Sequence, residues 1–226
     1  MKVQNILLGR SVRLLKFDQP MGGIHLKRAV DALQERYSFM RVPQTLEEYN
    51  EAQGIHFKHG RFLVDRDGTK REIVIDDFAV YSDGVVADTR SHTEEADDFL
   101  SDLINWGAEY FQMKYNLSQP MATYYISNLE IVLEAHLSEF VAPSTSIVQQ
   151  LTACFDRYGL KVGPFEVTSL VFDFDRKVMP SVSSNYTLQR REGVPFELNT
   201  YFSSAPLKTD DHIDLLQSLE ASAIPK

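Results

Sequence analysis

Two histidines near the middle of the first half form the residue pattern most suggestive of a metal site. His56 and His59 make a His-x-x-His motif, with Asp65 and Asp67 close by in the chain. Imidazole nitrogens and carboxylate oxygens are common metal ligands. On a strand, however, side chains three positions apart point to opposite faces, so the two rings converge only if this segment is a loop. We expect an exposed polar segment here rather than a metal site.

A pair of acidic residues in the second half is the next candidate. Asp173 and Asp175 alternate with two phenylalanines, so on a strand both carboxylates would lie on one face. Paired carboxylates can bind a cation or act as acid and base. The same alternation is typical of any strand with one face toward solvent, and we favour that simpler interpretation.

The single cysteine, Cys154, excludes an intramolecular disulfide and a zinc site built on several thiolates. It lies on the apolar stripe of an expected helix, between Leu151 and Phe155, and a buried cysteine behaves as a small apolar residue. We expect it in the core. No specific catalytic or cofactor motif occurs, so we predict no catalytic residue and no cofactor, and an enzyme is the less favoured class.

The segment from Arg190 to Glu197 is the most distinctive candidate for a surface contact. It combines Arg190, Arg191 and Phe196 around a Glu192-Gly193 turn, and arginine and aromatic residues are frequent in interface hot spots. We predict these three residues as interaction residues. The alternative is an ordinary hairpin with solvated arginines.

Composition narrows the class of partner. The chain has 23 Lys and Arg against 32 Asp and Glu, a formal net charge of −9, which repels polyanions and argues against nucleic-acid binding. No run of about 18 uncharged apolar residues is present, so we expect no membrane span. One thiol and no recognisable export signal favour a cytoplasmic location.

Residue patterning in the first half predicts strands and two helices. Asp18-Gln19-Pro20 is a helix-start signal, and the Asp67-Gly68 dipeptide is typical of a hairpin turn. We predict strands over 3–17, 55–65, 71–81 and 85–87, a helix with apolar spacing over 26–37, and a second helix from Thr93. The acidic, polar segment 45–54 is predicted as a loop with room for one helical turn.

The second half shows a comparable order. The segment 123–137 fits a strand by alternation and by its Thr and Tyr content, although its apolar residues also fit a helix. We predict a strand there, a helix from Ser144 or Thr145 to Gly159, a strand over 165–174, a hairpin over 186–191 and 196–202, and a last helix from Thr209.

The two halves correspond at an offset of about 116 residues. Thr93-Glu94-Glu95 then aligns with Thr209-Asp210-Asp211, although any well-capped amphipathic helix converges on such a start. We predict an α+β protein, mainly an antiparallel sheet with helices packed on one face, plausibly a tandem β-α-β-β-β-α repeat. The two units would be residues 1–117 and 118–226.

Together these observations favour a non-enzymatic intracellular interaction or scaffold protein that self-associates or docks on a protein partner. Antiparallel strands with open edges and aromatic side chains pair readily with other chains. One alternative is a small-molecule binding or sensing module with a pocket between the two units. A second alternative is a metal-dependent hydrolase that uses His56 and His59, or Asp173 and Asp175.

Overall fold

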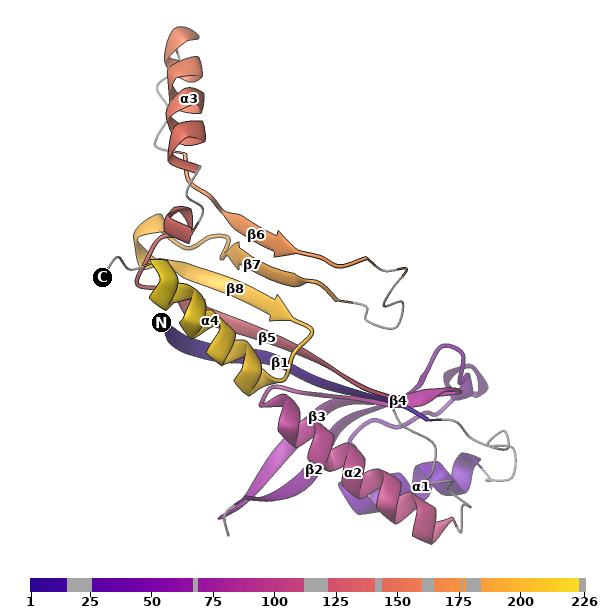
Figure 1. The fold of residues 1–226 in the computed structure, drawn as a ribbon. Helices are drawn as coiled ribbons and strands as arrows, with labels where there is room; N and C mark the ends of the chain where they lie inside the picture. Colours follow the sequence, from indigo (N-terminus) through magenta and orange to yellow (C-terminus); the bar gives the residue numbers. More distant parts are fainter. Residues whose placement is uncertain are drawn as a thin grey trace. The chain divides into compact units, whose positions relative to one another are not determined.

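A computed structural model of the chain shows an α+β fold built on one eight-stranded antiparallel sheet (Figure 1). The structure describes residues 1–15, 26–66, 69–111, 122–140, 144–159, 165–175, 177 and 184–223. The strand order is β2-β3-β4-β1-β5-β8-β7-β6. This confirms the predicted fold class.

The elements follow one another in the order expected from the sequence. The strands are β1 (Lys2–Leu14), β2 (Ile55–Arg66), β3 (Thr69–Tyr81), β4 (Gly84–Thr89), β5 (Ala122–Val132), β6 (Ser169–Phe172), β7 (Tyr186–Arg190) and β8 (Thr200–Ala205). The α-helices are α1 (Leu26–Tyr37), α2 (Thr93–Tyr110), α3 (Ser144–Arg157) and α4 (Thr209–Ala223). Three 3₁₀ turns are η2 (Leu46–Tyr49), η3 (Leu137–Phe140) and η4 (Phe196–Leu198). None of the helices in the described part of the chain has the length and apolarity needed to cross a bilayer.

Close contacts divide the chain into two compact units. Unit 1 contains residues 1–5, 128–205 and 210–226, and unit 2 contains residues 6–127 and 206–209. Each unit has its own buried residues and is described by itself below. The predicted division at residues 117 and 118 stays a prediction.

Unit 2 has an aromatic core between its helices and strands. α1 and α2 bury their apolar stripes against β2, β3 and β4, where Tyr37, Phe39, Phe78 and Phe99 are each at most 3% exposed. The ring of Tyr37 meets that of Phe99 edge-on at 5.0 Å, and Phe78 meets Phe99 at 5.5 Å. Edge-to-face aromatic pairs of this kind add to the burial energy. The apolar faces of both α1 and α2 are therefore buried within unit 2.

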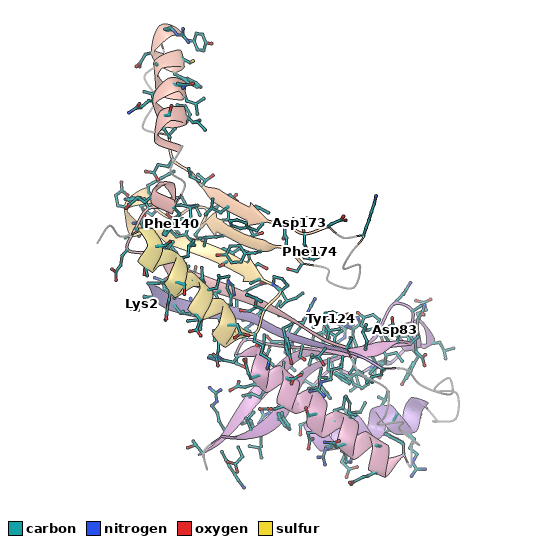
Figure 2. The ribbon with its side chains drawn as sticks, in the orientation of Figure 1. Lys2, Asp83, Tyr124, Phe140, Asp173 and Phe174 are labelled. Carbon is teal, nitrogen blue, oxygen red and sulfur yellow. The ribbon has the colours of Figure 1, made fainter. Side chains whose placement is uncertain are left out.

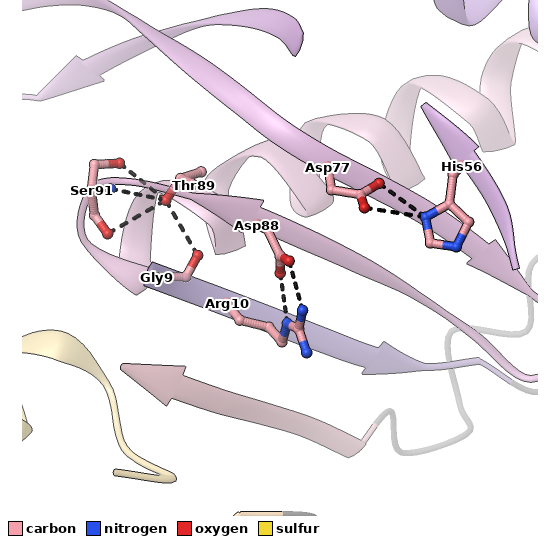
Figure 3. A network of polar contacts seen from close by, with 7 residues as sticks. All are labelled: Gly9, Arg10, His56, Asp77, Asp88, Thr89 and Ser91. Carbon is pink, nitrogen blue, oxygen red and sulfur yellow. Dashed lines mark hydrogen bonds and ion pairs between the residues drawn. The ribbon is translucent and has the colours of Figure 1, made fainter. Parts of the chain in front are cut away.

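The antiparallel pairing of β1 with β4 is held by side chains as well as backbone (Figure 3). Arg10 lies opposite Asp88, and its guanidinium donates to both carboxylate oxygens at 2.6 Å, which raises the pKa of Arg10. The Thr89 hydroxyl donates to the Gly9 carbonyl oxygen at 3.2 Å. A Cβ at Gly9 would lie 2.2 Å from the carbonyl oxygen of Ser91, so only glycine fits this close approach.

Unit 1 buries an apolar core together with polar groups, among them the pair Ser203 and His212. Leu129, Leu188 and Leu216, from β5, β7 and α4, are fully buried. Beside them Ser203 and His212 are also fully buried, and the Ser203 hydroxyl lies 2.8 Å from Nε2 of His212. Buried polar groups persist where they are hydrogen-bonded, so this pair is part of the packing.

The two halves share element order and spacing. β4 and β8 begin and end 116 residues apart and show the same alternation of buried and half-buried positions. α2 and α4 begin at Thr93 and Thr209, also 116 residues apart. Within unit 2 these threonines cap each other, because each hydroxyl accepts the other's backbone N–H at 2.9 and 2.8 Å. The duplication itself stays a prediction.

Several predicted boundaries were wrong. The predicted strand over 123–137 ends at Val132, and the chain then turns into η3, so neither a continuous strand nor a helix fits the segment. The predicted strand over 165–174 is reduced to β6. The predicted strand over 196–202 was wrong in its first part, because the chain forms η4 and a left-handed Asn199 before β8 begins at Thr200. The helix-start signal at Asp18-Gln19-Pro20 and the Asp67-Gly68 turn lie outside the described residues.

Candidate functional site

The edge strand of unit 1, β6, is the most exposed strand edge that the structure shows. β6 is the last strand in the sheet order, and its residues Ser169, Leu170, Val171 and Phe172 pair with β7 on one side. Val171 and Phe172 are 56% and 62% exposed. The strand contains no charged residue and no proline. It therefore lacks the charged side chains and the proline that many natural edge strands use against pairing with other chains.

At the opposite end of the sheet order, β2 in unit 2 is bridged by another segment of the chain at Lys58. The backbone N–H of Lys58 donates to the Arg41 carbonyl oxygen at 2.8 Å, and the Lys58 carbonyl oxygen accepts from Met40 and Arg41. Beyond this bridge His59 takes a left-handed conformation with φ of 56°. A covering segment and a local distortion both keep further strands away from an edge.

A second exposed apolar feature of unit 1 is the stripe of α3. Ile147, Leu151 and Tyr158 are 56%, 40% and 71% exposed. Cys154 lies on the same stripe and is only half-buried, with its sulfur 3.0 Å from a guanidinium nitrogen of Arg157. The prediction that Cys154 belongs to the core was therefore wrong. The periodicity of α3 was predicted correctly, but the described residues cover its apolar face only in part, since Phe165 packs on Phe155 at 5.2 Å while Ile147 and Leu151 stay exposed.

The predicted interaction residue Arg190 lies inside unit 1. Its side chain is 7% exposed and stands over the rings of Phe196 and Tyr201, at 4.0 and 5.6 Å from their centroids. One guanidinium nitrogen donates to the Phe196 carbonyl oxygen and another lies 3.7 Å from Glu166. Burial raises the pKa of the Tyr201 hydroxyl, which accepts from the Leu137 backbone N–H. Arg190 thus fastens η4 to β7 and β8.

The other two predicted interaction residues reach the surface. Arg191 is 42% exposed and its Nε lies 3.2 Å from a carboxylate oxygen of Glu130. Phe196 is 46% exposed although one face of its ring is covered by Arg190. As an interaction site, the trio stays a prediction, with Phe196 as its most accessible member.

His56 lies in a surface hollow of unit 2 of about 540 Å³. Its Nδ1 lies 3.0 and 3.2 Å from the two carboxylate oxygens of Asp77 (Figure 3). Arg41, Lys58 and Glu48 also line the hollow. A carboxylate at one ring nitrogen orients the imidazole and leaves the other nitrogen for a ligand or a proton. This arrangement suits a small polar ligand better than an apolar one.

The remaining predicted metal ligands are not brought together. His59 is exposed on β2, and neither it nor His56 belongs to a cluster of three potential metal ligands among the described residues. Asp173 follows the end of β6, as Figure 2 shows, and its carboxylate accepts the backbone N–H of Phe174. Asp175 accepts the N–H of Lys177 in the same way. Local turns account for these contacts of the two carboxylates.

A second hollow of unit 2, of about 480 Å³, is lined by charged groups that pair with one another. Arg36 donates to both carboxylate oxygens of Asp102 at 3.0 Å, and the Tyr37 hydroxyl donates to the same carboxylate at 2.7 Å. Burial, and then the neighbouring Asp102, raise the pKa of Tyr37. These groups hold α1 to α2 rather than offering free charge to a ligand.

Sequence reasoning missed Val171 and Phe172, the two most exposed apolar residues of the edge strand β6. The uncharged run Ser-Leu-Val-Phe was visible in the sequence, but which strand ends the sheet was not. Comparison with known proteins gives no further guide, since no family model matches the chain and no curated protein matches it significantly.

Proposed function

We propose that this chain is a protein-interaction module that takes up a strand of a protein partner along the β6 edge. The single observation that carries the proposal is the outer edge of β6, which pairs with no other described strand and where Val171 and Phe172 are more than half exposed. An added strand satisfies the backbone groups of such an edge, and alternate side chains provide specificity. The non-enzymatic role predicted from the sequence is consistent with this proposal.

The protected edge of β2 supports the same proposal by contrast. The segment around Arg41 bonds to β2 at Lys58, whereas β6 pairs with no described strand on its outer side. Long-lived exposed edges carry a risk of aggregation, so an edge without protection is expected where a partner binds. The apolar stripe of α3 lies in the same unit and adds a second surface that a protein partner can use.

Photo-crosslinking tests this proposal directly. A photoreactive amino acid replaces Val171 on the β6 edge, or Leu63 on β2, which is 64% exposed and serves as the matched control. In cells that produce the protein, we expect crosslinks from position 171 that map to an extended segment of a protein, and none from position 63. Equal yields at both positions, or no crosslink at 171, would contradict the proposal.

A second candidate function is binding of a small polar ligand or metal ion at His56. The observation that favours it is the contact of His56 with Asp77 inside a hollow of about 540 Å³, a size within the range of ligand pockets. Native mass spectrometry of protein purified without chelators tests it. A bound mass that is lost in His56→Ala and kept in His59→Ala would support ligand binding. If the native chain and both variants show only the mass of the protein, this second function is wrong.

A further inference from the structure

The direction of the backbone groups in β6 follows from its pairing with β7. The Arg190 backbone N–H donates to the Thr168 carbonyl oxygen at 2.8 Å. In an antiparallel pair, the groups of every second residue point to the same neighbour. Leu170 and Phe172 therefore face β7 with their backbone groups, whereas those of Ser169 and Val171 point away from it. The sheet order gives no strand on that outer side among the described residues.

The sequence of this edge is complementary to itself. When two copies of a strand pair antiparallel about a two-fold axis, one residue must lie opposite its own copy. If that residue is Val171, then Leu170 lies opposite Phe172 of the second copy, and Ser169 lies opposite Asp173. Every facing pair is then either apolar or a hydroxyl beside a carboxylate, and such cross-strand pairs stabilise a sheet.

The charge on the chain does not prevent this contact locally. Two copies with a net charge of −9 each repel one another. β6 itself carries no charge, and in this register the two Asp173 residues lie four positions apart along the strands, roughly 13 Å at about 3.3 Å per residue. Exposed charges separated by more than about 8 to 10 Å are largely screened at physiological salt.

We propose that the occupant of the β6 edge is the β6 strand of a second copy of this chain, paired antiparallel about Val171. This inference rests on the proposed function and names its partner. Four-residue edges bury little surface, so the dimer is weak, with a dissociation constant in the micromolar range. Because the copies carry like charge, added salt strengthens the dimer, whereas it would weaken binding to a basic partner.

Sedimentation velocity over a concentration series tests the inference. The native chain is expected to pass from monomer to dimer as its concentration rises. At a fixed concentration, the dimer fraction should also increase when NaCl is raised from about 50 to about 500 mM. Val171→Lys places two ammonium groups directly opposite one another, so it should weaken the dimer at least tenfold. Leu63→Lys, at a similarly exposed position on β2 of unit 2, should leave it unchanged. Circular dichroism confirms that both variants fold.

A disulfide test fixes the register. In a Cys154→Ser background, Val171→Cys should form a disulfide-linked dimer on mild oxidation, because its two copies face each other, and Leu63→Cys should not. A native chain that stays monomeric at all concentrations, together with no disulfide at position 171, overturns the inference. The proposed function is judged separately, because crosslinks from position 171 to a different protein would then uphold it, and no crosslinks would end both.

Discussion

α1 of unit 2 and α3 of unit 1 have the same apolar spacing and different surroundings. Val30, Leu33 and Tyr37 in α1 are 5%, 8% and 3% exposed. The same spacing in α3 places Val148, Leu151 and Phe155, of which Leu151 is 40% exposed and the other two are half-buried. An amphipathic pattern therefore shows that a helix has an apolar face, but not what covers that face.

The edge strands of the two units also differ in how far other residues of the chain cover them. β2 is bridged by the segment at Arg41 and interrupted at His59, whereas the uncharged β6 pairs with no described strand on its outer side. Phe39, from the segment that protects β2, also packs on Phe57 and Phe78 in the core. Unit 2 thus covers its helix and its strand edge with residues of its own chain. Among the described residues of unit 1, Ile147 and Leu151 of α3 and Val171 of β6 stay exposed.

The largest expected effect comes from truncating the matched leucines of the two helices. Leu33→Ala removes a buried side chain and leaves a cavity, so the free energy of unfolding should fall by about 2 to 5 kcal/mol. Leu151→Ala should cost less than about 1 kcal/mol, because the side chain is already partly in water. Urea unfolding followed by circular dichroism measures both. Equal losses would show that α3 is as well packed as α1 and would break the comparison.

The reciprocal caps at the starts of α2 and α4 should show the next largest effect. Thr93→Val leaves the buried backbone N–H of Thr209 without its acceptor, and Thr209→Val leaves the backbone N–H of Thr93 without its acceptor. Each should lower the free energy of unfolding by about 1 to 3 kcal/mol. Thr152→Val in α3, where the hydroxyl only donates back to the Val148 carbonyl oxygen, is the control and should change little. Very unequal losses at 93 and 209 would count against their equivalence.

The buried polar pair of unit 1 gives a third contrast. At an offset of 116, Ser203 and His212 correspond to Ala87 and Ala96 of unit 2, and all four side chains are buried. Ser203→Ala removes the hydrogen bond to His212 and should cost about 1 to 2 kcal/mol in thermal unfolding. Ala87→Ser places a hydroxyl beside apolar groups and should cost a similar amount. A Ser203→Ala variant that is as stable as the native chain would show that the pair is dispensable.

The smallest effect is a pH dependence at η2. Backbone N–H groups of Gln44 and Thr45, and then Arg41, lower the pKa of Glu48 below its ordinary 4.5. A lowered pKa means that Glu48 stabilises the turn above its unfolded-state pKa and that this contribution disappears as pH falls through the folded value. An NMR titration should therefore show a Glu48 midpoint below 4.5, which moves upward in Arg41→Ala. A midpoint at 4.5 or above would contradict the capping geometry.

Much of the fold was predictable because local patterns decide it. The Thr93-Glu94-Glu95 start predicted α2, and the two β-rich runs over 55–65 and 71–81, separated by the Asp67-Gly68 dipeptide, predicted β2 and β3. Val171 and Phe172 could not be identified as functional candidates, since the position of a strand in a sheet depends on pairing between distant residues. The interior place of Arg190 was unpredictable for the same reason, because Phe196 and Tyr201 enclose it only in the folded chain.

The central claim is that the β6 edge of unit 1 binds another chain. Hydrogen exchange measured at two protein concentrations tests it most directly. The outward-facing backbone N–H of Val171 should exchange rapidly in dilute protein and become markedly slower when the protein is concentrated. The backbone N–H of Lys58, already bonded to Arg41 within the chain, should exchange at the same rate in both samples. If the Val171 amide exchanges equally fast at both concentrations and Val171→Lys changes nothing, β6 is not the place where two copies meet.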